Sequence, residues 1–271
     1  MATTTDIQTH YGTQSIRARI EKALTDAGID AGKISPADIA ALDQFHTRGL
    51  AATIELADSL GIDADSRVLD IGAGLGGSAR HLAARYGCVV QGIDASAPFV
   101  EAATYLNQRT GLADKVSIQL GDALDLPFAD ASFDIAWTQH VAMNIGDRPR
   151  LYREINRVLR PGGKLGLYDV VAGEGEVLFP VPWASSPAAS FLLSPSEMTK
   201  VLDDAGFDVV SSKDCSAAGI AFFERLRDSP PKSPLGLQAV MGPQFKQMTE
   251  NFGHNLEAGH VKLVQAVFRK R

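Results

Sequence analysis

The chain has 271 residues, of which 45% are hydrophobic and 21% charged. This composition is that of a globular protein and excludes a disordered, collagen-like or coiled-coil chain. The formal net charge of −6 gives no general attraction for nucleic acid or anionic lipid, so a small-molecule partner is favoured. The two cysteines, Cys88 and Cys215, lie far apart and predict neither a disulfide framework nor a zinc site.

Two segments bear on where the protein resides. Residues 1–10 are polar and lack the basic-then-apolar order of a signal peptide. The uncharged stretch 177–196 is long enough to cross a bilayer, but its prolines and serines predict a loop. With both thiols reduced, the protein is expected to be cytoplasmic and to have no membrane span.

The first quarter of the chain has apolar residues at helical spacing. Two stripes are formed by Ile16, Ile20, Ala23 and Leu24, and by Leu50, Ile54, Ala57 and Leu60. Ser35 followed by Pro36 has the form of a helix N-cap and a first-turn proline. Residues 1–66 are therefore predicted to form a helical cap that precedes a core of residues 67–271.

From Arg67 onward, short apolar runs alternate with helical patterns. Strands are predicted at 68–71, 88–93, 116–120, 133–138, 164–171, 207–211 and 260–269. Helices are predicted at 77–86, 98–109, 151–159, 195–205 and 243–251. This alternation indicates an α/β fold with a parallel sheet covered on both faces.

The most informative segment is VLDIGAGLGG, which joins the first predicted strand to its helix. Gly72, Gly74 and Gly77 have the spacing of a dinucleotide-binding turn, although this match alone shows only that backbone can approach a ligand closely. Asp70 changes the interpretation, because a carboxylate at this turn repels pyrophosphate and suits a cation. S-adenosylmethionine, with its ammonium and sulfonium groups, meets that description.

Two further acidic residues follow predicted strands. Asp94 ends the second strand, where a carboxylate can accept both hydroxyls of a ribose. Asp122 follows the third strand and could accept the amino group of an adenine. Either residue could instead be a helix N-cap or a turn aspartate, so their order along the chain carries the argument.

The stretch from about Arg67 to Arg160 resembles the class I S-adenosylmethionine-dependent methyltransferases, through VLDIGAGLGG, GIDAS, GDALDLPFADASFD and RVLRPGG. The resemblance implies a Rossmann-like, doubly wound seven-stranded sheet, mostly parallel, whose last strand is antiparallel and arrives by a hairpin-like return of residues 260–269. It implies S-adenosylmethionine as cofactor and S-adenosylhomocysteine as product. The implied cofactor residues are Asp70, Gly72, Gly74, Gly76, Asp94, Ala95, Asp122, Ala123, Gln139 and Tyr11.

A wider resemblance concerns the acceptor of the methyl group. DQFHTRGLAAT and MNIGDRPRLYREINRVLRPGGKLGLYDV are similar to the small-molecule branch that includes sarcosine and dimethylglycine N-methyltransferases, tocopherol-type enzymes and natural-product sugar methyltransferases. This branch gives a slight preference for an amine acceptor. A hydroxyl or carbon acceptor on a natural product or an isoprenoid or quinone-like metabolite remains open.

Three residues are candidates for catalysis. His140 follows the fourth predicted strand, at the sheet edge where ligands of such folds bind, and an imidazole can take a proton near neutral pH. Asp169, in the next strand, could orient that histidine or bind a cationic acceptor, and the two resemble a pair proposed for rebeccamycin-type sugar methyltransferases. His46 could close over the cofactor. Each could equally serve only the backbone, as a cap or turn residue.

Aromatic and apolar residues suggest a wall for the acceptor. Met143, Phe179, Trp183 and Phe191 could form it, with lid insertions around 172–193 and 214–258, although such residues also pack under long loops. The spacing of His254 and His260 is no metal motif, so no metal is predicted, although a diphosphate acceptor could recruit magnesium.

Other functions stay open on the sequence alone. The glycine spacing also permits a nicotinamide-dependent oxidoreductase, which Asp70 argues against, and a cofactor sensor without turnover cannot be separated from an enzyme. Nucleic-acid methylation is disfavoured by the acidic charge and by TQHV standing where such enzymes carry Asn-Pro-Pro-Tyr. The partner is therefore expected to be a small-molecule acceptor and not nucleic acid, with the protein a monomer or a homodimer.

Overall fold

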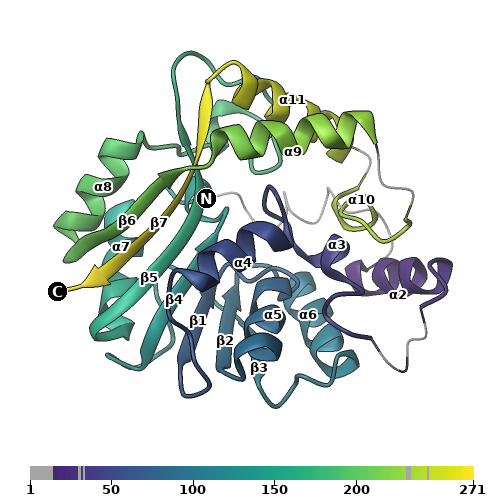
Figure 1. The fold of residues 1–271 in the computed structure, drawn as a ribbon, viewed down its shortest axis with the longest axis horizontal. Coiled ribbons are helices and arrows are strands. Elements are labelled where there is room, and N and C mark those ends of the chain that lie inside the picture. Colours follow the sequence, from purple (N-terminus) through teal and green to yellow (C-terminus); the bar gives the residue numbers. More distant parts are fainter. Residues whose placement is uncertain (1–14, 30–31, 33, 230–232, 243) are drawn as a thin grey trace.

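A computed structural model describes residues 15–29, 32, 34–229, 233–242 and 244–271. Seven strands form one sheet in the order β3-β2-β1-β4-β5-β7-β6 (Figure 1). They are β1 (Arg67–Ile71), β2 (Val89–Asp94), β3 (Val116–Leu120), β4 (Phe133–Gln139), β5 (Leu159–Ala172), β6 (Phe207–Asp214) and β7 (Val261–Lys270). Only β7 runs antiparallel to its neighbours, β5 and β6. The predicted sheet is confirmed.

Helices cover both faces of the sheet. They are α2 (Ile16–Asp26), α3 (Ala40–Asp43), α4 (Leu50–Asp58), α5 (Gly77–Tyr86), α6 (Ala97–Arg109), α7 (Arg148–Val158), α8 (Pro195–Asp204), α9 (Ser216–Asp228), α10 (Gln238–Met241) and α11 (Phe245–Glu257). Short 3-10 helices lie at Ala142–Asn144 and Pro187–Ala189. Helices α4, α5, α9 and α11 bury residues in the core on one face, and α7 and α8 in the core on the other.

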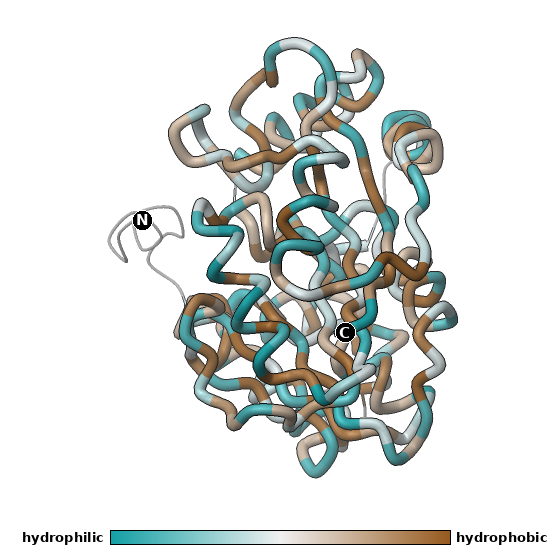
Figure 2. Tube along the Cα trace, turned by 90° about the vertical axis from the view of Figure 1, so that its left-hand side faces the viewer, coloured by the Kyte–Doolittle hydropathy of each residue, from teal (hydrophilic) through white to brown (hydrophobic). Residues whose placement is uncertain are grey.

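Side-chain alternation assigns the residues of β4 and β5 to these two cores. Trp137 and Tyr168 belong to the core under α5 and α11, whereas Ala136 and Leu167 belong to the core under α7 and α8. Figure 2 shows hydrophobic and hydrophilic residues interleaved along the chain, as expected for helices and strands that bury one face. In Figure 1, α9 and α11 lie above the carboxyl ends of the parallel strands.

The amino-terminal helices follow the predicted stripes, with one exception. The stripe of α2 is buried and packs against α6 and α10. The prediction that a helix starts at Ser35 is wrong. Both the backbone N–H and the hydroxyl of Ser35 donate to Asp38, which closes a turn, and α3 begins only at Ala40. The division into a cap and a core stays a prediction.

The carboxyl-terminal third holds more helix than the pattern predicted. Between β6 and β7 lie α9, α10 and α11, so the hairpin-like return to the last strand is wrong even though the antiparallel pairing is present. Residues 173–194 form the predicted loop, apart from a bridge between Val181 and Ala184 and the 3-10 helix at Pro187–Ala189. Within the described residues, no helix is long and apolar enough to cross a membrane.

A buried ion pair fastens α3 to the first helix after the glycine turn. Arg80 donates to Asp43 at 2.7 Å and to Asn107 Oδ1 at 2.8 Å, and both charged side chains are almost fully buried. The carbonyl and carboxylate of Asp43 also lie where a Cβ on Gly77 would stand. Close approach of α3 to α5 therefore requires glycine at position 77.

Substitution of Gly77 by alanine is expected to lower the free energy of unfolding by about 1–3 kcal/mol, because the added methyl group displaces Asp43 from Arg80. Urea denaturation followed by circular dichroism measures the change. Gly253→Ala in α11 is the matched control, since its Cβ makes only ordinary contact with Phe223 and alanine favours a helix by about 1 kcal/mol. Equal stabilities of the two variants would contradict the close approach.

Candidate active site

The glycine turn lies between β1 and α5, with its first three backbone amides already bound. Gly72 N and Ala73 N both donate to the carbonyl of Ile93 at 2.9 Å, and Gly74 N donates to Asp94 Oδ2 at 2.8 Å. A phosphate-binding turn instead points such amides at its ligand. These three amides are therefore unsuited to a pyrophosphate.

The glycines of this turn adopt conformations that other residues rarely take. Gly72, Gly74 and Gly76 have φ angles of 70°, 54° and 79°. A Cβ on Gly72 would lie 2.5 Å from Val141 Cγ2, and one on Gly74 would lie 3.2 Å from the Phe45 ring. The turn is thus packed between the residues that follow β4 and those that precede α4.

Asp70, two residues before the first glycine of this turn, has a carboxyl oxygen without a hydrogen-bond partner in the described part of the chain. It is only 3% exposed, and its Oδ2 is buried without a hydrogen-bond partner among the described residues. Burial, together with the nearby charge of Asp94, raises the pKa of Asp70 to about 8. A cationic ligand at this carboxyl would satisfy the oxygen and favour its ionised form, so the residue fits the ammonium group of S-adenosylmethionine.

Asp94 and Asp122, predicted to hold ribose and adenine, lie in different surroundings. Asp94 accepts from Gly74 N and, at 2.9 Å, from Ser96 N, and burial raises its pKa. Asp122 is exposed and accepts from Leu124 N at 2.8 Å, as a turn aspartate does. Each carboxylate keeps lone pairs for a ligand. The other predicted cofactor residues are the exposed Ala95, the half-buried Ala123, and Tyr11, which lies outside the described residues.

Gln139, at the end of β4, belongs to a buried polar cluster that joins β4 to α4 and α5. Its Oε1 accepts from Ser78 at 2.7 Å, from Trp137 Nε1 at 3.0 Å and from Thr53 at 3.2 Å. The single hydroxyl proton of Thr53 is shared with Gln44 Oε1, which lies closer, at 2.7 Å. Gln139 Nε2 is buried without a partner, which leaves an amide donor for a ligand beside the glycine turn.

Three rings meet at the end of β4, and one of them, that of Tyr168, lies within β5. His140 has a φ of 53°, and its backbone N–H donates to the backbone carbonyl of Tyr168 at 2.8 Å. The Tyr168 ring centroid lies 5.1 Å from that of His140 and 6.0 Å from that of His46, and the two histidine rings are 6.1 Å apart. The sequence argument identified both histidines as candidates, but it did not single out Tyr168.

Burial keeps both histidines neutral. It lowers the pKa of His46 to about 4 and the pKa of His140 well below the usual value, and the histidines also lie beside each other. His46 Nε2 lies 2.9 Å from the Gly49 carbonyl, which only accepts, so this nitrogen carries the proton. His140 Nε2 is buried and has no hydrogen-bond partner.

The structure does not bring Asp169 to His140. Its two carboxylate oxygens accept from Ala142 N at 3.1 Å and from Val170 N at 3.0 Å, and burial raises its pKa to about 6. Alternation along β5 places Tyr168 on the face of His140 and Asp169 on the other. Among the described residues Asp169 is bound to backbone amides and Tyr168 is the side chain beside the His140 ring, so the orientation of His140 by Asp169, or the binding of a cationic acceptor there, stays a prediction.

Aromatic side chains line the side of His140 opposite the sheet. The Phe252 ring in α11 lies 6.2 Å from His140, 5.0 Å from Trp183 and 5.3 Å from Phe223, centroid to centroid. Trp183 Nε1 donates to the Ser190 hydroxyl at 3.0 Å. Of the four residues predicted to form the acceptor wall, Trp183 belongs to this aromatic cluster. Phe252 and Phe223 were missed, although Met248, Phe252 and Leu256 recur at helical spacing.

The other predicted acceptor residues lie elsewhere. Met143 is 2% exposed and forms part of the core, and its carbonyl accepts from Phe191 N at 2.9 Å. Phe191 is 40% exposed and lies over Gly146. Phe179 is half-buried. Their role in binding an acceptor stays a prediction.

Helix α11 holds the loop that carries Trp183. Asn255 accepts from Leu178 N at 2.8 Å and donates to the Leu178 carbonyl at 2.9 Å. One turn earlier, Asn251 donates to the Pro180 carbonyl at 2.9 Å. These buried asparagines fix the loop against the helix that presents Phe252.

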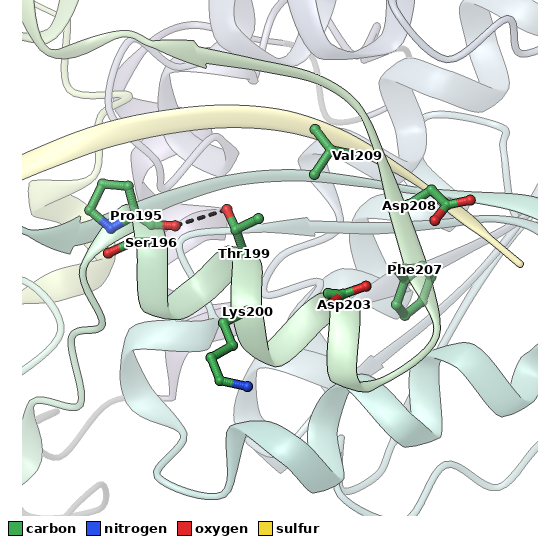
Figure 3. Close-up of a pocket in the computed structure, with 8 residues that line it drawn as sticks. All are labelled: Pro195, Ser196, Thr199, Lys200, Asp203, Phe207, Asp208 and Val209. Carbon is green, nitrogen blue, oxygen red and sulfur yellow. Dashed lines mark hydrogen bonds between the residues drawn. The ribbon is translucent and has the colours of Figure 1, made fainter.

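Two further observations concern a metal site and a pocket outside the glycine turn. No group of three or more histidines, cysteines or acidic residues in the described part of the chain is arranged to hold a metal ion. A pocket of about 640 Å³ lies between α8 and β6, away from the glycine turn (Figure 3). Its charged side chains are already paired, Lys200 with Asp204 and Asp203 with Arg271.

Comparisons with known proteins agree with this geometry. Residues 69–167 match the methyltransferase domain family. Methyltransferase GfsG of Streptomyces halstedii is 39% identical over 134 residues, which cover 49% of this chain and 48% of that protein. Sarcosine/dimethylglycine N-methyltransferase of Halorhodospira halochloris is 29% identical over 215 residues, which cover 77% of this chain and 76% of that protein.

The fold is also that of solved methyltransferases. Geranyl diphosphate C-methyltransferase from Streptomyces coelicolor superposes with a TM-score of 0.72 at 21% identity, over 100% of this chain and 99% of that one. Names among the matched proteins include N-, O- and C-methyltransferases. The chain spans 48%, 28% and 27% of the length of three of the curated relatives it matches.

Proposed function

We propose that this chain is a class I, S-adenosylmethionine-dependent methyltransferase that methylates a small-molecule acceptor, because residues 69–167 match the methyltransferase domain family and 77% of the chain is similar to a sarcosine/dimethylglycine N-methyltransferase. The observation that supports this most strongly is Asp70, whose buried carboxyl oxygen lacks a partner beside a turn with bound amides. That combination suits a cationic nucleoside without phosphates.

In this proposal the described residues divide between holding the cofactor and handling the acceptor. Asp70 pairs with the cofactor's ammonium group, Asp94 with its ribose, and Gln139 Nε2 donates to its methionine end. When bound, S-adenosylmethionine supplies a methyl group on a sulfonium. His140 takes the acceptor's proton where the accepting atom starts protonated. The aromatic cluster of Phe252, Trp183 and Phe223 excludes water.

The acceptor is the open part of this function. The amine preference rests on the resemblance to sarcosine and dimethylglycine enzymes and on aromatic faces, which suit a cation. The surroundings of His140 add little support for an amine acceptor that carries a carboxylate, such as sarcosine. Arg48, which lies near His46 and Tyr168, is already bound to Glu55 through two nitrogens and so is not free for a substrate carboxylate.

Calorimetry and labelled transfer test the proposal together. S-adenosylhomocysteine is expected to bind and NADH is not, since Gly72, Ala73 and Gly74 offer no free amide to a pyrophosphate. A metabolite extract incubated with protein and methyl-labelled S-adenosylmethionine is expected to yield a labelled product, identified by mass spectrometry. Binding of NADH alone would support an oxidoreductase, and binding of S-adenosylhomocysteine without labelled product would support a sensor.

Some predictions from the sequence are untouched by these findings. They concern the catalytic role of His46, the cytoplasmic location, the lack of a nucleic-acid partner and the choice between monomer and homodimer. Gel filtration of the labelled-transfer sample, with and without added RNA and DNA, measures the last two.

A further inference from the structure

Two unsatisfied polar atoms lie at the ring cluster of His140 and Tyr168. His140 Nε2 and the Tyr168 hydroxyl are both buried, and neither has a hydrogen-bond partner of normal geometry among the described residues. Arg48 lies near the Tyr168 hydroxyl and partly offsets the rise that burial causes in its pKa, but no hydrogen bond of normal length and angle joins the two. Their rings, those of His140 and Tyr168, are tilted by only 31° with centroids 5.1 Å apart, so the two side chains are direct neighbours. A buried polar group without a partner destabilises a protein, so a ligand that completes both atoms would be favoured here.

The charges around this pair disfavour a charged ligand. His46 and His140 are neutral, and burial raises the pKa of the Tyr168 hydroxyl so that it stays protonated. The nearby guanidinium of Arg48 is neutralised by Glu55. The Asp169 carboxyl lies on the other face of the sheet, bound to backbone amides. No free carboxylate of the described residues is placed to pair with an ammonium acceptor at this position.

The polarity of the two atoms specifies what they bind. With its proton on Nδ1, the neutral His140 ring presents Nε2 as an acceptor, and the phenol of Tyr168 donates. A hydroxyl group satisfies both at once, because it donates through its proton and accepts through its oxygen. The neighbouring Phe252 ring, and Trp183 and Phe223 behind it, favour an apolar or aromatic skeleton around that hydroxyl.

We propose that the methyl acceptor is a neutral alcohol or phenol whose hydroxyl binds between His140 Nε2 and the hydroxyl of Tyr168. This inference rests on the proposed function and names its substrate class. Tyr168 donates to the acceptor oxygen and aims one of its lone pairs. His140 Nε2 takes the proton of the hydroxyl while the new O–CH3 bond forms, and the S–CH3 bond of the sulfonium donor breaks with its electron pair retained by sulfur.

Tyr168→Phe, which removes only the hydroxyl, tests the assignment without knowledge of the natural substrate. In the free protein the variant is expected to have an unchanged or higher Tm, because an unsatisfied buried hydroxyl is removed. Tyr152→Phe is the matched control: its buried hydroxyl accepts from Arg148 at 3.3 Å, so its loss is expected to lower the Tm. A fall in Tm for Tyr168→Phe equal to that of Tyr152→Phe would overturn the assignment.

Activity provides the second readout. Methyl-labelled S-adenosylmethionine is offered with a panel of neutral phenols and alcohols, each paired with the amine of the same carbon skeleton, and with sarcosine. Transfer is expected to the hydroxyl member of a pair, and Tyr168→Phe is expected to reduce kcat/KM for it by about tenfold, with unchanged affinity for S-adenosylhomocysteine. The Tyr152→Phe control is expected to keep wild-type kcat/KM.

The outcomes separate this inference from the function on which it rests. Transfer only to amines, at a rate that Tyr168→Phe leaves unchanged, would overturn the hydroxyl acceptor and leave a methyltransferase. Failure of the wild-type protein to bind S-adenosylhomocysteine would overturn the proposed function itself, and the Tm comparison would still decide whether the Tyr168 hydroxyl is unsatisfied.

Discussion

Substitution of Asp70 by asparagine is expected to weaken binding of S-adenosylhomocysteine by about 30-fold or more, the loss typical when one partner of a buried charge pair is removed. Asparagine keeps the shape of the side chain and the packing under the glycine turn, but it leaves the ligand's ammonium without a counter-charge. Isothermal titration calorimetry at pH 7.5 measures the change. Asp114→Asn, on an exposed loop before β3, is the control and is expected to bind as the wild type does.

The raised pKa of Asp70 adds a pH dependence to this expectation. Below its pKa of about 8 in the free protein, the carboxyl is mostly protonated, and a cation must displace that proton to bind. Affinity of the wild type is therefore expected to rise between pH 5.5 and 7.5, by up to about tenfold per pH unit. Asp70→Asn is expected to remove this slope. An equal slope in both proteins would show that another group takes up the proton.

The same group has the opposite effect on stability. The folded pKa of about 8 lies above the unfolded value, so the folded state binds more protons than the unfolded state between about pH 4 and 8. Stability contributed by this carboxyl is present at low pH and is lost as the pH rises through that window. Asp70→Asn is thus expected to raise the Tm of the free protein at pH 7.5 while it abolishes tight binding.

Replacement of His140 by alanine is expected to lower turnover at least tenfold, and by about 10²-fold to 10⁴-fold if proton transfer limits the rate. Cofactor affinity is expected to change little, since Asp70 and Asp94 lie on β1 and β2. Initial rates with labelled S-adenosylmethionine and calorimetry with S-adenosylhomocysteine measure the two quantities. Unchanged turnover would remove His140 from the mechanism.

The pH profile of the wild type checks the same role. A base acts in its neutral form, and burial beside His46 lowers the pKa of His140 well below the usual value. Turnover at saturating substrates is therefore expected to be flat between pH 6 and 8, without the fall near pH 6.5 of an ordinary histidine. His254→Ala is the control, because this histidine is exposed on α11 beside Glu257, at 3.8 Å, and its removal is expected to leave the pH profile of turnover unchanged.

The cofactor side of the site was predictable because its determinants are local. The glycine turn and the strand-end carboxylates Asp70 and Asp94 each follow from a strand and the residues directly after it. The order of the parallel strands then brings both carboxylates to one edge of the sheet. A pattern of this kind needs no knowledge of long-range packing.

The acceptor side depends on packing between distant segments, and the prediction was correspondingly poorer. The positive φ of His140 takes its ring out of the strand alternation and places it over Tyr168, which no residue pattern indicates. Phe252 reaches His140 only because α11 folds back across the sheet. Asp169 was paired with His140 by nearness along neighbouring strands, without regard to the face each side chain takes.

The position of β7 constrains how the protein folds. Residues 261–270 are inserted between β5 and β6, and β6 pairs with no strand other than β7 among the described residues. Both neighbours leave the ribosome before β7 does, so β6 has no strand to pair with until those residues are made. Assembly of the sheet thus ends with a long-range insertion, a type of contact that forms slowly and leaves strand edges open meanwhile.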